Sequence, residues 1–285
     1  MSGVLYVVGT PIGNLGDVTL RAAETLRDVD RVVAEDTRRT RTLLTHLGVE
    51  KKPLTSLEAH ASPDDVAEVV DWLSAGQSVA LVTDAGMPSV SDPGAALVRA
   101  AALAGIRVTP VPGPSAVTAA IAASGLVEGR FRFFGFLPRA GTARADAMTA
   151  VLSTPEAVVL FEAPTRIAAT LQELAALCPA RLLVLAREMT KVHEELLRGT
   201  VAEVAQGAKD REWLGEVTIV LGADPAAGTI AAVDDERIDE RIREGLARGE
   251  TAKTLSQRVA AWSGRSRREI YERVLAAKSL GERDA

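Results

Sequence analysis

The segment Val79-Ala-Leu-Val-Thr-Asp-Ala-Gly-Met-Pro-Ser89 joins an apolar, strand-like run to a polar loop broken by Gly and Pro. The same arrangement occurs twice more: Gly9-Thr-Pro-Ile-Gly-Asn14 follows the apolar run Val4–Val8, and Pro110-Val-Pro-Gly-Pro-Ser115 follows Arg107–Thr109. In a parallel α/β sheet the carboxyl ends of the strands share one edge, and ligands bind in the crevice there. We therefore expect the three loops to outline one small-molecule pocket.

The chain alternates between strand-like and helix-like stretches from Val4 to about Gly125. Short β-branched runs predict strands near 4–9, 31–35, 53–57, 78–83 and 107–111. Ala/Leu periodicity predicts helices near 19–28, 37–47, 64–75, 93–104 and 115–123. This alternation is typical of a parallel, doubly wound α/β sheet.

Cap residues mark the ends of two of these helices. Ser62-Pro-Asp-Asp65 and Ser91-Asp-Pro93 place hydroxyl and carboxylate groups and a proline where the third and fourth helices should begin. Gly76 and Gly105 follow the same two helices and predict their ends.

A second alternating block begins after Phe131-Arg-Phe-Phe-Gly-Phe-Leu-Pro138, the densest aromatic cluster of the chain. It predicts strands near 131–136, 157–162, 181–187 and 216–222 and helices near 142–153 and 165–177, whereas 200–214 fits neither pattern. After a linker-like segment over 223–229, three short helices are predicted over 235–248, 251–262 and 266–278. We therefore expect an N-terminal α/β lobe over 1–125, a C-terminal α/β lobe over 126–224 and a helical tail over 235–285.

Composition limits the classes of function. The 285 residues carry a net charge of −5 and only 4% aromatic residues, which argues against a generally polycationic nucleic-acid binder and against base stacking as the main contact. Two local basic patches exist, and solvated helix faces are the simpler interpretation of both: Arg38, Arg39 and Arg41, and Arg265, Arg267, Arg268 and Arg273. The single Cys178 excludes an intrachain disulfide and a multi-cysteine zinc site. Because no apolar run approaches membrane-spanning length, we expect a cytoplasmic protein without a membrane span.

The loop residues narrow the class of ligand. Gly9-Thr-Pro-Ile-Gly-Asn14 lacks the G-x-G-x-x-G spacing of dinucleotide folds and the Lys-Ser/Thr ending of a P-loop. Asp84 follows a fully apolar strand, where a carboxylate either caps the next turn or meets a ligand, and we favour ligand contact for Asp84 and Met87. Ser115 is either the cap of the next helix or, with Ala116, part of a pocket wall that three prolines keep rigid.

Six runs carry a more specific signal: Gly9–Asp17, Ala34–Arg38, Thr83–Gly94, Pro112–Ala116, Phe136–Pro138 and Phe161–Arg166. On these runs the chain resembles the bacterial 16S ribosomal RNA cytidine 2′-O-methyltransferases of the tetrapyrrole-methylase-like superfamily, which are class III methyltransferases. The resemblance extends from residue 4 to about 222, and the helical tail is also similar. One stretch departs from the family, because it keeps His60 but has Ala61 where relatives tend to carry Asn, and this puts a catalytic role for that stretch in doubt.

The resemblance implies two α/β lobes of the tetrapyrrole-methylase type, with S-adenosyl-L-methionine (SAM) in the cleft between them, and a homodimer as the usual assembly. The N-terminal lobe would carry the SAM and RNA side, and the C-terminal lobe would complete the cleft. Carried over position by position, the resemblance places cofactor contacts at Pro11, Ile12, Asp84, Met87, Ser115, Ala116 and Phe161. It implies that the substrate is a cytidine in the decoding region of 16S ribosomal RNA, either as free RNA or in the small ribosomal subunit.

The implied reaction is in-line attack of a ribose 2′-hydroxyl on the sulfonium methyl group, and a positioned base would assist this weak nucleophile. The candidate catalytic residues follow second-lobe strands and should border the cleft: Glu162, Arg187, Glu188 and Lys191. A salt bridge between the lobes is the alternative interpretation of these residues. Phosphate contacts are expected at Arg38, Arg39 and Arg166. Methyl transfer requires no metal, and no His, Cys or carboxylate spacing indicates one.

Two other functions stay open at this point. One is a methyltransferase that acts on a porphyrinoid or another small molecule, because one architecture can serve several substrates. The other is a non-catalytic ribosome-assembly factor that binds RNA and holds SAM without transfer. The basic residues favour RNA over a small molecule, and methyl incorporation separates the binding factor from both enzymes.

Overall fold

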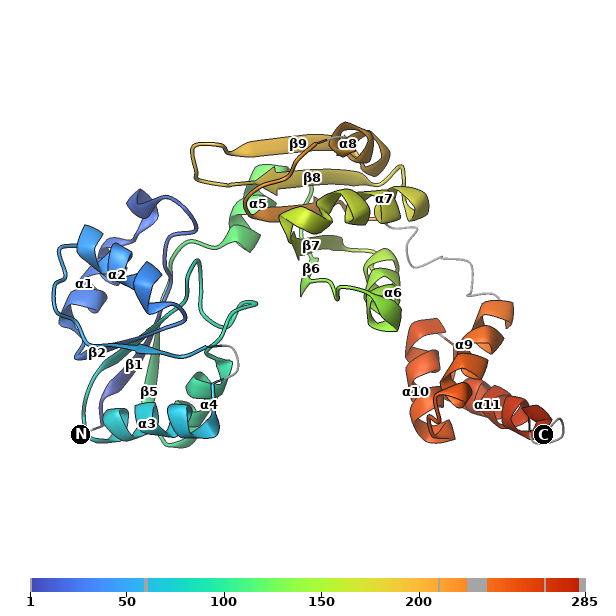
Figure 1. Ribbon diagram of the computed structural model, residues 1–285, viewed down its shortest axis with the longest axis horizontal. Helices are drawn as coiled ribbons and strands as arrows, with labels where there is room; N and C mark the ends of the chain where they lie inside the picture. Colours follow the sequence, from blue (N-terminus) through green and yellow to red (C-terminus); the bar gives the residue numbers. More distant parts are fainter. Residues whose placement is uncertain (1, 59–60, 210, 225–234, 264, 282–285) are drawn as a thin grey trace. The chain divides into compact units, whose positions relative to one another are not determined.

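The computed structural model describes residues 2–58, 61–209, 211–224, 235–263 and 265–281. These residues form two compact units, which are coloured along the sequence in Figure 1. The first unit comprises the chain up to Phe136 together with Val159–Gly222. The second comprises Leu137–Val158 and the described residues beyond Gly222. The lobe boundaries that the sequence predicts at residues 125 and 224 stay predictions.

A five-stranded parallel sheet organises the N-terminal half of the first unit. Its strands are β1 (Val4–Val8), β2 (Arg31–Ala34), β3 (Leu54–Ser56), β4 (Val79–Val82) and β5 (Arg107–Val111), in the order β3-β2-β4-β1-β5. Leu5 of β1 pairs with Val79 on one side and with Val108 on the other. All four residues of β4 are buried, as expected for a strand with helices on both faces. The predicted parallel sheet is confirmed.

Helices cover both faces of this sheet. The helices α1 (Leu20–Asp28) and α2 (Thr37–His46) pack against one face, where Leu26 and Leu44 meet Val32. The helices α3 (Pro63–Ser74) and α4 (Ala95–Leu103) cover the other face, where Leu73 and Leu97 meet Val33. Neighbouring β2 residues therefore serve opposite layers, as the alternation of side chains along a strand requires. Because the chain leaves β1 through α1 and leaves β4 through α4, the switch point of the doubly wound sheet lies between β1 and β4.

The predicted helix caps are right in one case and wrong in another. Ser62 forms a complete capping box with Asp65 at the start of α3. The fourth helix instead begins after Gly94, which has φ 124° and offers no side-chain cap, so Ser91-Asp92-Pro93 is not a cap. Leu81 explains the glycine, because its side chain would lie 2.8 Å from a Cβ at position 94.

A second sheet of five strands occupies the rest of the first unit and has mixed strand directions. Its strands are β6 (Phe131–Phe136), β7 (Ala157–Glu162), β8 (Leu182–Arg187), β9 (Glu195–Thr200) and β10 (Val217–Leu221), in the order β6-β7-β10-β8-β9. Strand β8 runs antiparallel to both of its neighbours. Strand β9 was not expected, because this edge strand is only half buried and lacks a clear apolar alternation. Thr200 and Glu203 form a capping box at the start of α8 (Val201–Ala208), in the stretch that fitted neither pattern.

Two more helices belong to the part of the first unit that contains the second sheet. The helix α5 (Ala116–Ser124) packs against the second sheet, where Val117 and Ala120 meet Val159 and Val220. The helix α7 (Ile167–Leu177) follows a short 3₁₀ turn at Pro164–Arg166 and packs against α8. The chain that follows β5 therefore crosses directly from the first sheet to the second.

The second unit contains α6 (Gly141–Leu152) and three tail helices, α9 (Asp235–Ala247), α10 (Ala252–Ser263) and α11 (Arg267–Gly281). The tail helices share a small core, in which Ile238, Leu255 and Ile270 are fully buried. Thr251 and Ser266 cap α10 and α11, because their hydroxyl oxygens accept the backbone N–H groups of Thr254 and Glu269.

Three arginines of the tail pair with acidic residues of the tail, in part between different helices. Arg265 and Arg273 both contact Asp235, and Arg268 contacts Glu272. These pairs account for most of the basic patch that the sequence places in the tail. None of the described helices is long and apolar enough to cross a membrane.

Candidate functional site

The three Gly/Pro-rich loops meet at the switch point of the first sheet. The N–H of Thr10 donates to the carbonyl of Gly86 at 2.9 Å, and the N–H of Gly86 donates back to Thr10 at 3.1 Å. A Cβ at Gly9 would lie 2.7 Å from the Cα of Gly113 and 2.7 Å from the sulfur of Met87. Only backbone without side chains allows this approach, which explains the glycines in the first and third loops.

A cavity at this junction has a volume of about 330 Å³ and is mainly apolar. The first-sheet loops contribute Ile12, Met87, Ser115 and Ala116, so all three loops line one cavity, as predicted. The remaining wall comes from the second sheet and its connections: Phe136, Phe161, Glu162, Ala163, Pro164, Met189 and Gly215–Thr218. The Phe161 ring packs against those of Phe133 and Phe136, at centroid distances of 4.9 Å and 5.5 Å. This wall suits a flat, largely apolar ligand group.

A second, more polar cavity of about 180 Å³ adjoins the first, and the two share Ile12, Ala85 and Glu216. Its polar lining combines hydroxyl groups with two cations and two carboxylates: Thr10, Thr40, Thr42, Thr83, Arg39, Lys191, Asp84 and Glu216. Pro11 and Gly13 complete the wall on the side of the β1 loop. A ligand that bears charged or hydroxyl groups fits this cavity.

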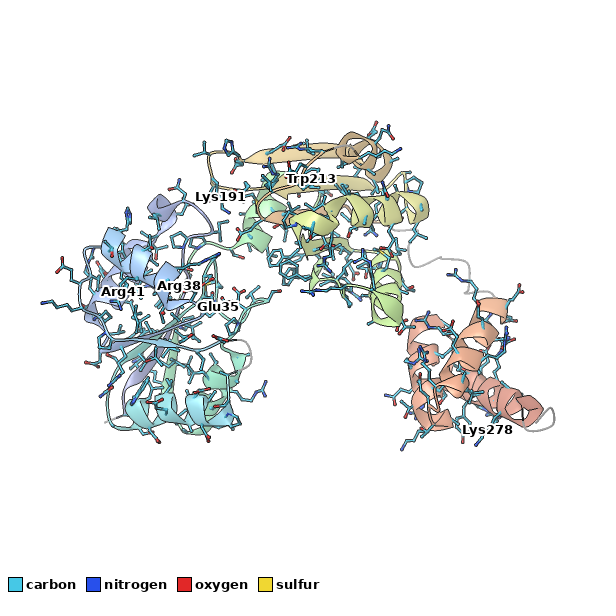
Figure 2. The ribbon with its side chains drawn as sticks, in the orientation of Figure 1. Glu35, Arg38, Arg41, Lys191, Trp213 and Lys278 are labelled. Carbon is cyan, nitrogen blue, oxygen red and sulfur yellow. The ribbon has the colours of Figure 1, made fainter. Side chains whose placement is uncertain are left out.

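Lys191 reaches the second cavity from the segment that joins β8 and β9 (Figure 2). A Cβ at Gly13 would lie 2.6 Å from Cγ of Lys191, so the glycine leaves room for the lysine side chain. The Lys191 amine donates to Glu188 at 2.8 Å and to Glu216 at 3.1 Å. Burial disfavours the charged amine, but the two hydrogen bonds outweigh it and raise the pKa of Lys191. The amine therefore stays protonated and cannot accept a proton near neutral pH.

Glu188 stays ionised for the complementary reason. Burial alone would raise the pKa of Glu188, but the hydrogen bonds from the Lys191 amine and the Glu216 N–H lower it below its ordinary value. A Cβ at Gly215 would lie 2.2 Å from Oε1 of Glu188, so this glycine allows the carboxylate to approach the backbone. Glu188 therefore holds Lys191 and the 215–216 backbone in place.

Glu162 is almost completely buried, with a side-chain exposure of 1%. Its carboxylate accepts hydrogen bonds from the Thr170 hydroxyl at 2.6 Å and from the Ala163 N–H at 2.8 Å. The guanidinium of Arg166 lies 2.6 Å from the same carboxylate. This arrangement anchors the turn between β7 and α7, and a direct chemical role for Glu162 stays a prediction.

Arg187 supports the backbone on the same side of the first cavity. Its Nε donates to the carbonyl of Leu214 at 2.9 Å, and its guanidinium lies 3.5 Å from Glu195. Arg166, Arg187 and Glu188 are all absent from the described residues that line the two cavities. The structure thus brings Glu162 and Lys191 to the cavity walls and places the other three behind them.

Two of the three arginines expected to bind RNA, Arg38 and Arg39, occupy different environments at the start of α2. Arg38 is 90% exposed and pairs with Asp36, whose pKa falls to about 2 through hydrogen bonds from Arg38 (Figure 2). Arg39 lines the second cavity and lies 3.4 Å from Asp84. Arg38 can therefore reach a partner on the protein surface, whereas Arg39 faces the cavity.

Asp92 lines the first cavity, and the sequence interpretation missed it by treating it as part of a helix cap. Its carboxylate is half buried, which raises its pKa, and the carboxylates of Glu35, Asp84 and Glu216 raise it further. The Thr83 hydroxyl acts in the opposite direction, and the resulting pKa is about 6. The signal that identifies Asp92 is the unusual density of polar and Gly/Pro residues after β4, which exceeds what one turn needs.

Within the ranges that the structure describes, no three His, Cys, Asp or Glu side chains are grouped so that they could hold a metal ion. His60, in the stretch of sequence that departs from the family pattern, lies outside the described residues.

The chain matches known proteins over most of its length. The sequence profile of the Tetrapyrrole (Corrin/Porphyrin) Methylases matches residues 4–205. The ribosomal RNA small subunit methyltransferase I of Xylella fastidiosa (strain Temecula1) is 46% identical over 277 residues, covering 94% of this chain and 98% of that protein. The protein of the same name from Bacillus subtilis (strain 168) is 36% identical, covering 95% of this chain and 93% of that protein.

Solved structures show the same fold at low identity. Diphthine synthase superimposes with a TM-score of 0.60 at 19% identity, covering 78% of this chain and 90% of that one. Uroporphyrin-III-C-methyltransferase from Thermus thermophilus superimposes with a TM-score of 0.54 at 20% identity, covering 79% and 96%. The same architecture therefore occurs in solved structures whose names differ from those of the sequence relatives.

Proposed function

Since the chain belongs to the tetrapyrrole (corrin/porphyrin) methylase family and is a methyltransferase, we propose that it methylates the 2′-hydroxyl of a cytidine in small-subunit ribosomal RNA, with SAM as the methyl donor. The observation that carries this proposal is identity of up to 46% along almost the whole chain with proteins named ribosomal RNA small subunit methyltransferase I. The choice of the ribose of a decoding-region cytidine rests on the sequence resemblance.

The residues expected to hold SAM fit that cofactor. Five of them line the first cavity: Ile12, Met87, Ser115, Ala116 and Phe161. Pro11 and Asp84 line the adjoining second cavity. An apolar, aromatic-walled cavity next to one lined by carboxylates and cations matches a ligand that has an adenine ring at one end and an amino acid at the other. The Ser115 side chain makes no cap bond, so the first N–H groups of α5 remain available to a ligand.

The chain's own residues contribute mainly by positioning. When bound, SAM supplies a methyl group carried on a positively charged sulfur, and the leaving group is a neutral thioether. Fixing two reactants in a productive geometry is worth about 7–11 kcal/mol of a reaction barrier. The Glu188–Lys191–Glu216 cluster and the Arg187–Leu214 bond hold the second-sheet wall, and Glu162 with Arg166 anchors the turn beside it. We assign Glu162, Arg187, Glu188 and Lys191 to this task.

Contact with RNA is proposed at Arg38, Arg39 and Arg166, with the 16S ribosomal RNA or the small ribosomal subunit as the partner. Arg38 is the best placed for a phosphate because its side chain is 90% exposed and it pairs only with Asp36 among the described residues. Arg39 faces the second cavity and would meet the target nucleotide there. A phosphate contact of Arg166 would have to compete with its ion pair to Glu162 at 2.6 Å.

The assembly and location are also proposals. We propose a cytoplasmic homodimer, in line with the resemblance that the sequence motifs carry. Light scattering on purified protein tests the oligomer directly, and a monomeric mass at assay concentrations would reject the dimer.

The test of the function is transfer of labelled methyl from SAM to purified small ribosomal subunits that lack the modification, with mass mapping of the RNA. We expect label on the ribose of one cytidine. Free 16S RNA and a porphyrinoid mixture serve as parallel acceptors. Label on a porphyrinoid alone would support the small-molecule methyltransferase instead. Binding of SAM and subunits without any incorporation would support a non-catalytic assembly factor.

A further inference from the structure

Three carboxylates line the first cavity, and they differ in their partners. Glu162 is held by Arg166 at 2.6 Å, and Glu216 lies 3.1 Å from the Lys191 amine. Asp92 makes no ion pair with any residue that the structure describes. A carboxylate that is committed to a cation is a poor proton acceptor, so Asp92 is the one of the three that retains this capacity.

The loop that carries Asp92 is held in an unusual conformation. Ser89 and Ser91 have φ values of 70° and 65°, in the left-handed region that favours glycine, and Gly94 has φ 124°. Such a conformation is unfavourable for a non-glycine residue and persists only where the surroundings enforce it. The Ser89 N–H donates to the Pro93 carbonyl at 3.2 Å, which closes the loop around Asp92.

The second sheet supports the same loop from the opposite side. The Ser91 hydroxyl oxygen would lie 2.8 Å from a Cβ at Gly135, so the loop packs directly on β6. Phe136, the next residue of β6, lines the same cavity as Asp92. The Asp92 carboxylate is therefore presented to the cavity from a loop that both sheets fix in place.

We propose that Asp92 is a catalytic residue that accepts the proton of the ribose hydroxyl during methyl transfer. This inference rests on the proposed function. In the step, the new C–O bond forms as the C–S bond breaks, and the electron pair of the C–S bond stays on sulfur. The hydroxyl proton moves to a carboxylate oxygen of Asp92, from which water removes it after the product leaves. Atoms and charge balance without any other reactant.

The charged groups around Asp92 suit this role. Glu35, Asp84 and Glu216 are the carboxylates that face it, and partial burial adds to their effect, so its pKa rises to about 6. The cations of the second cavity, Arg39 and Lys191, pair with Asp84 and Glu216. A base whose pKa lies just below the working pH is ionised and still accepts a proton more readily than an ordinary aspartate.

The decisive experiment compares the wild type with Asp92→Asn in the subunit methylation assay across a range of pH. Asp71→Asn, on the exposed face of α3, is the matched control. We expect Asp92→Asn to lower kcat by at least about 100-fold, the usual contribution of a general base, with KM for subunits unchanged. The wild-type rate should fall below an apparent pKa of about 6, and the residual rate of Asp92→Asn should lose this acidic limb. The control should match the wild type.

Two further readouts do not depend on turnover. Calorimetry with the neutral product S-adenosylhomocysteine should give the same affinity for wild type and Asp92→Asn, which shows that the variant is folded at the site. Carbon-13 NMR of aspartate-labelled protein, assigned by comparison with Asp92→Asn, should show a carboxylate that titrates near pH 6.

Several results would overturn the proposal. These are a kcat of Asp92→Asn close to that of the wild type, an acidic limb that survives the substitution, or an Asp92 resonance that titrates in the ordinary aspartate range. Failure of the proposed function can be distinguished from failure of the role of Asp92. If the proposed function is wrong, the wild type itself transfers no methyl group to subunits or free RNA. In that case both proposals fall, whereas an active Asp92→Asn variant overturns only the role of Asp92.

Discussion

Replacing Arg166 with Met should destabilise the first unit through the carboxylate that it leaves behind. Glu162 has a side-chain exposure of 1%, Arg166 one of 22%, and their charged groups lie 2.6 Å apart. Removing one partner of a buried ion pair costs about 3–5 kcal/mol, because the remaining charge stays buried without compensation. The hydrogen bonds from Thr170 and Ala163 remain and moderate the loss. We therefore expect a decrease of about 3 kcal/mol in the free energy of unfolding for Arg166→Met.

A double-mutant cycle makes this expectation specific. In the pair Glu162→Gln with Arg166→Met the buried charge is gone, and the amide oxygen can still accept the Ala163 N–H while the amide nitrogen donates to Thr170. The double variant should therefore be about 1.5–2 kcal/mol more stable than Arg166→Met alone. Glu162→Gln alone should cost about 1–2 kcal/mol, because Arg166 can reach water.

Urea unfolding followed by tryptophan fluorescence measures these changes. Trp213 is one of the three tryptophans of the chain and lies in the first unit, where its indole is buried and donates to the Ala208 carbonyl. The reasoning is refuted if Arg166→Met loses less than about 1 kcal/mol, the range of an exposed ion pair. It is refuted equally if the double variant is no more stable than Arg166→Met. A large loss of subunit affinity with unchanged stability would instead assign Arg166 to RNA.

Three further perturbations test other parts of the site. Gly13→Ala places a methyl group 2.6 Å from Cγ of Lys191, and we expect the methylation rate to fall at least about 10-fold. Gly129→Ala is the control, because its methyl group meets nothing within 4 Å and should leave the rate unchanged. Equal rates for the two variants would show that the position of Lys191 is unimportant. Asp92→Asn should raise the free energy of unfolding by about 1 kcal/mol at pH 8, after allowance for solvent screening, and not at all at about pH 3. The sign follows because a folded-state pKa of about 6, against 3.8, makes the wild type lose stability as the pH rises between the two values. A gain of the full size at about pH 3 in urea titrations would contradict it. Arg38→Gln should reduce the slope of log affinity for subunits against log salt by about 0.7–0.9, and an unchanged slope in filter-binding titrations would remove Arg38 from the RNA contact.

Much of the first sheet was predictable because its signals are local. Apolar runs such as Val79–Val82 are buried on both faces, and Gly/Pro loops follow directly at the strand ends, so both strand positions and the shared pocket follow from the sequence. Strand β9 was not predictable, since its pairing with β8 comes from a distant segment and its own residues are only half buried. Propensity carries little information about an edge strand of this kind.

The site shows the same division between local and distant causes. The cavity positions of Met87, Ser115 and Phe161 follow from their places at strand ends, which the sequence displays. Asp92 was misread because Ser-Asp-Pro is also a common helix start, and only the packing of Leu81 against Gly94 moves the start of α4 past it. The partners of Glu162 and Lys191 likewise depend on residues that only the folded chain brings together.

The contact between Gly9 and Gly113 has a consequence for how such a site can change over time. On the side of the first cavity that these loops form, the small residues Gly86 and Ala116 stand beside the larger Ile12 and Met87, and a side chain added at Gly9 or Gly113 would separate the loops. The opposite wall is built from large side chains, among them Phe136 and Met189, which can be exchanged one at a time. Variation in acceptor preference should therefore accumulate on the second-sheet wall while the Gly9–Gly113 contact stays fixed, and a mutant library meant to alter the acceptor belongs on that wall.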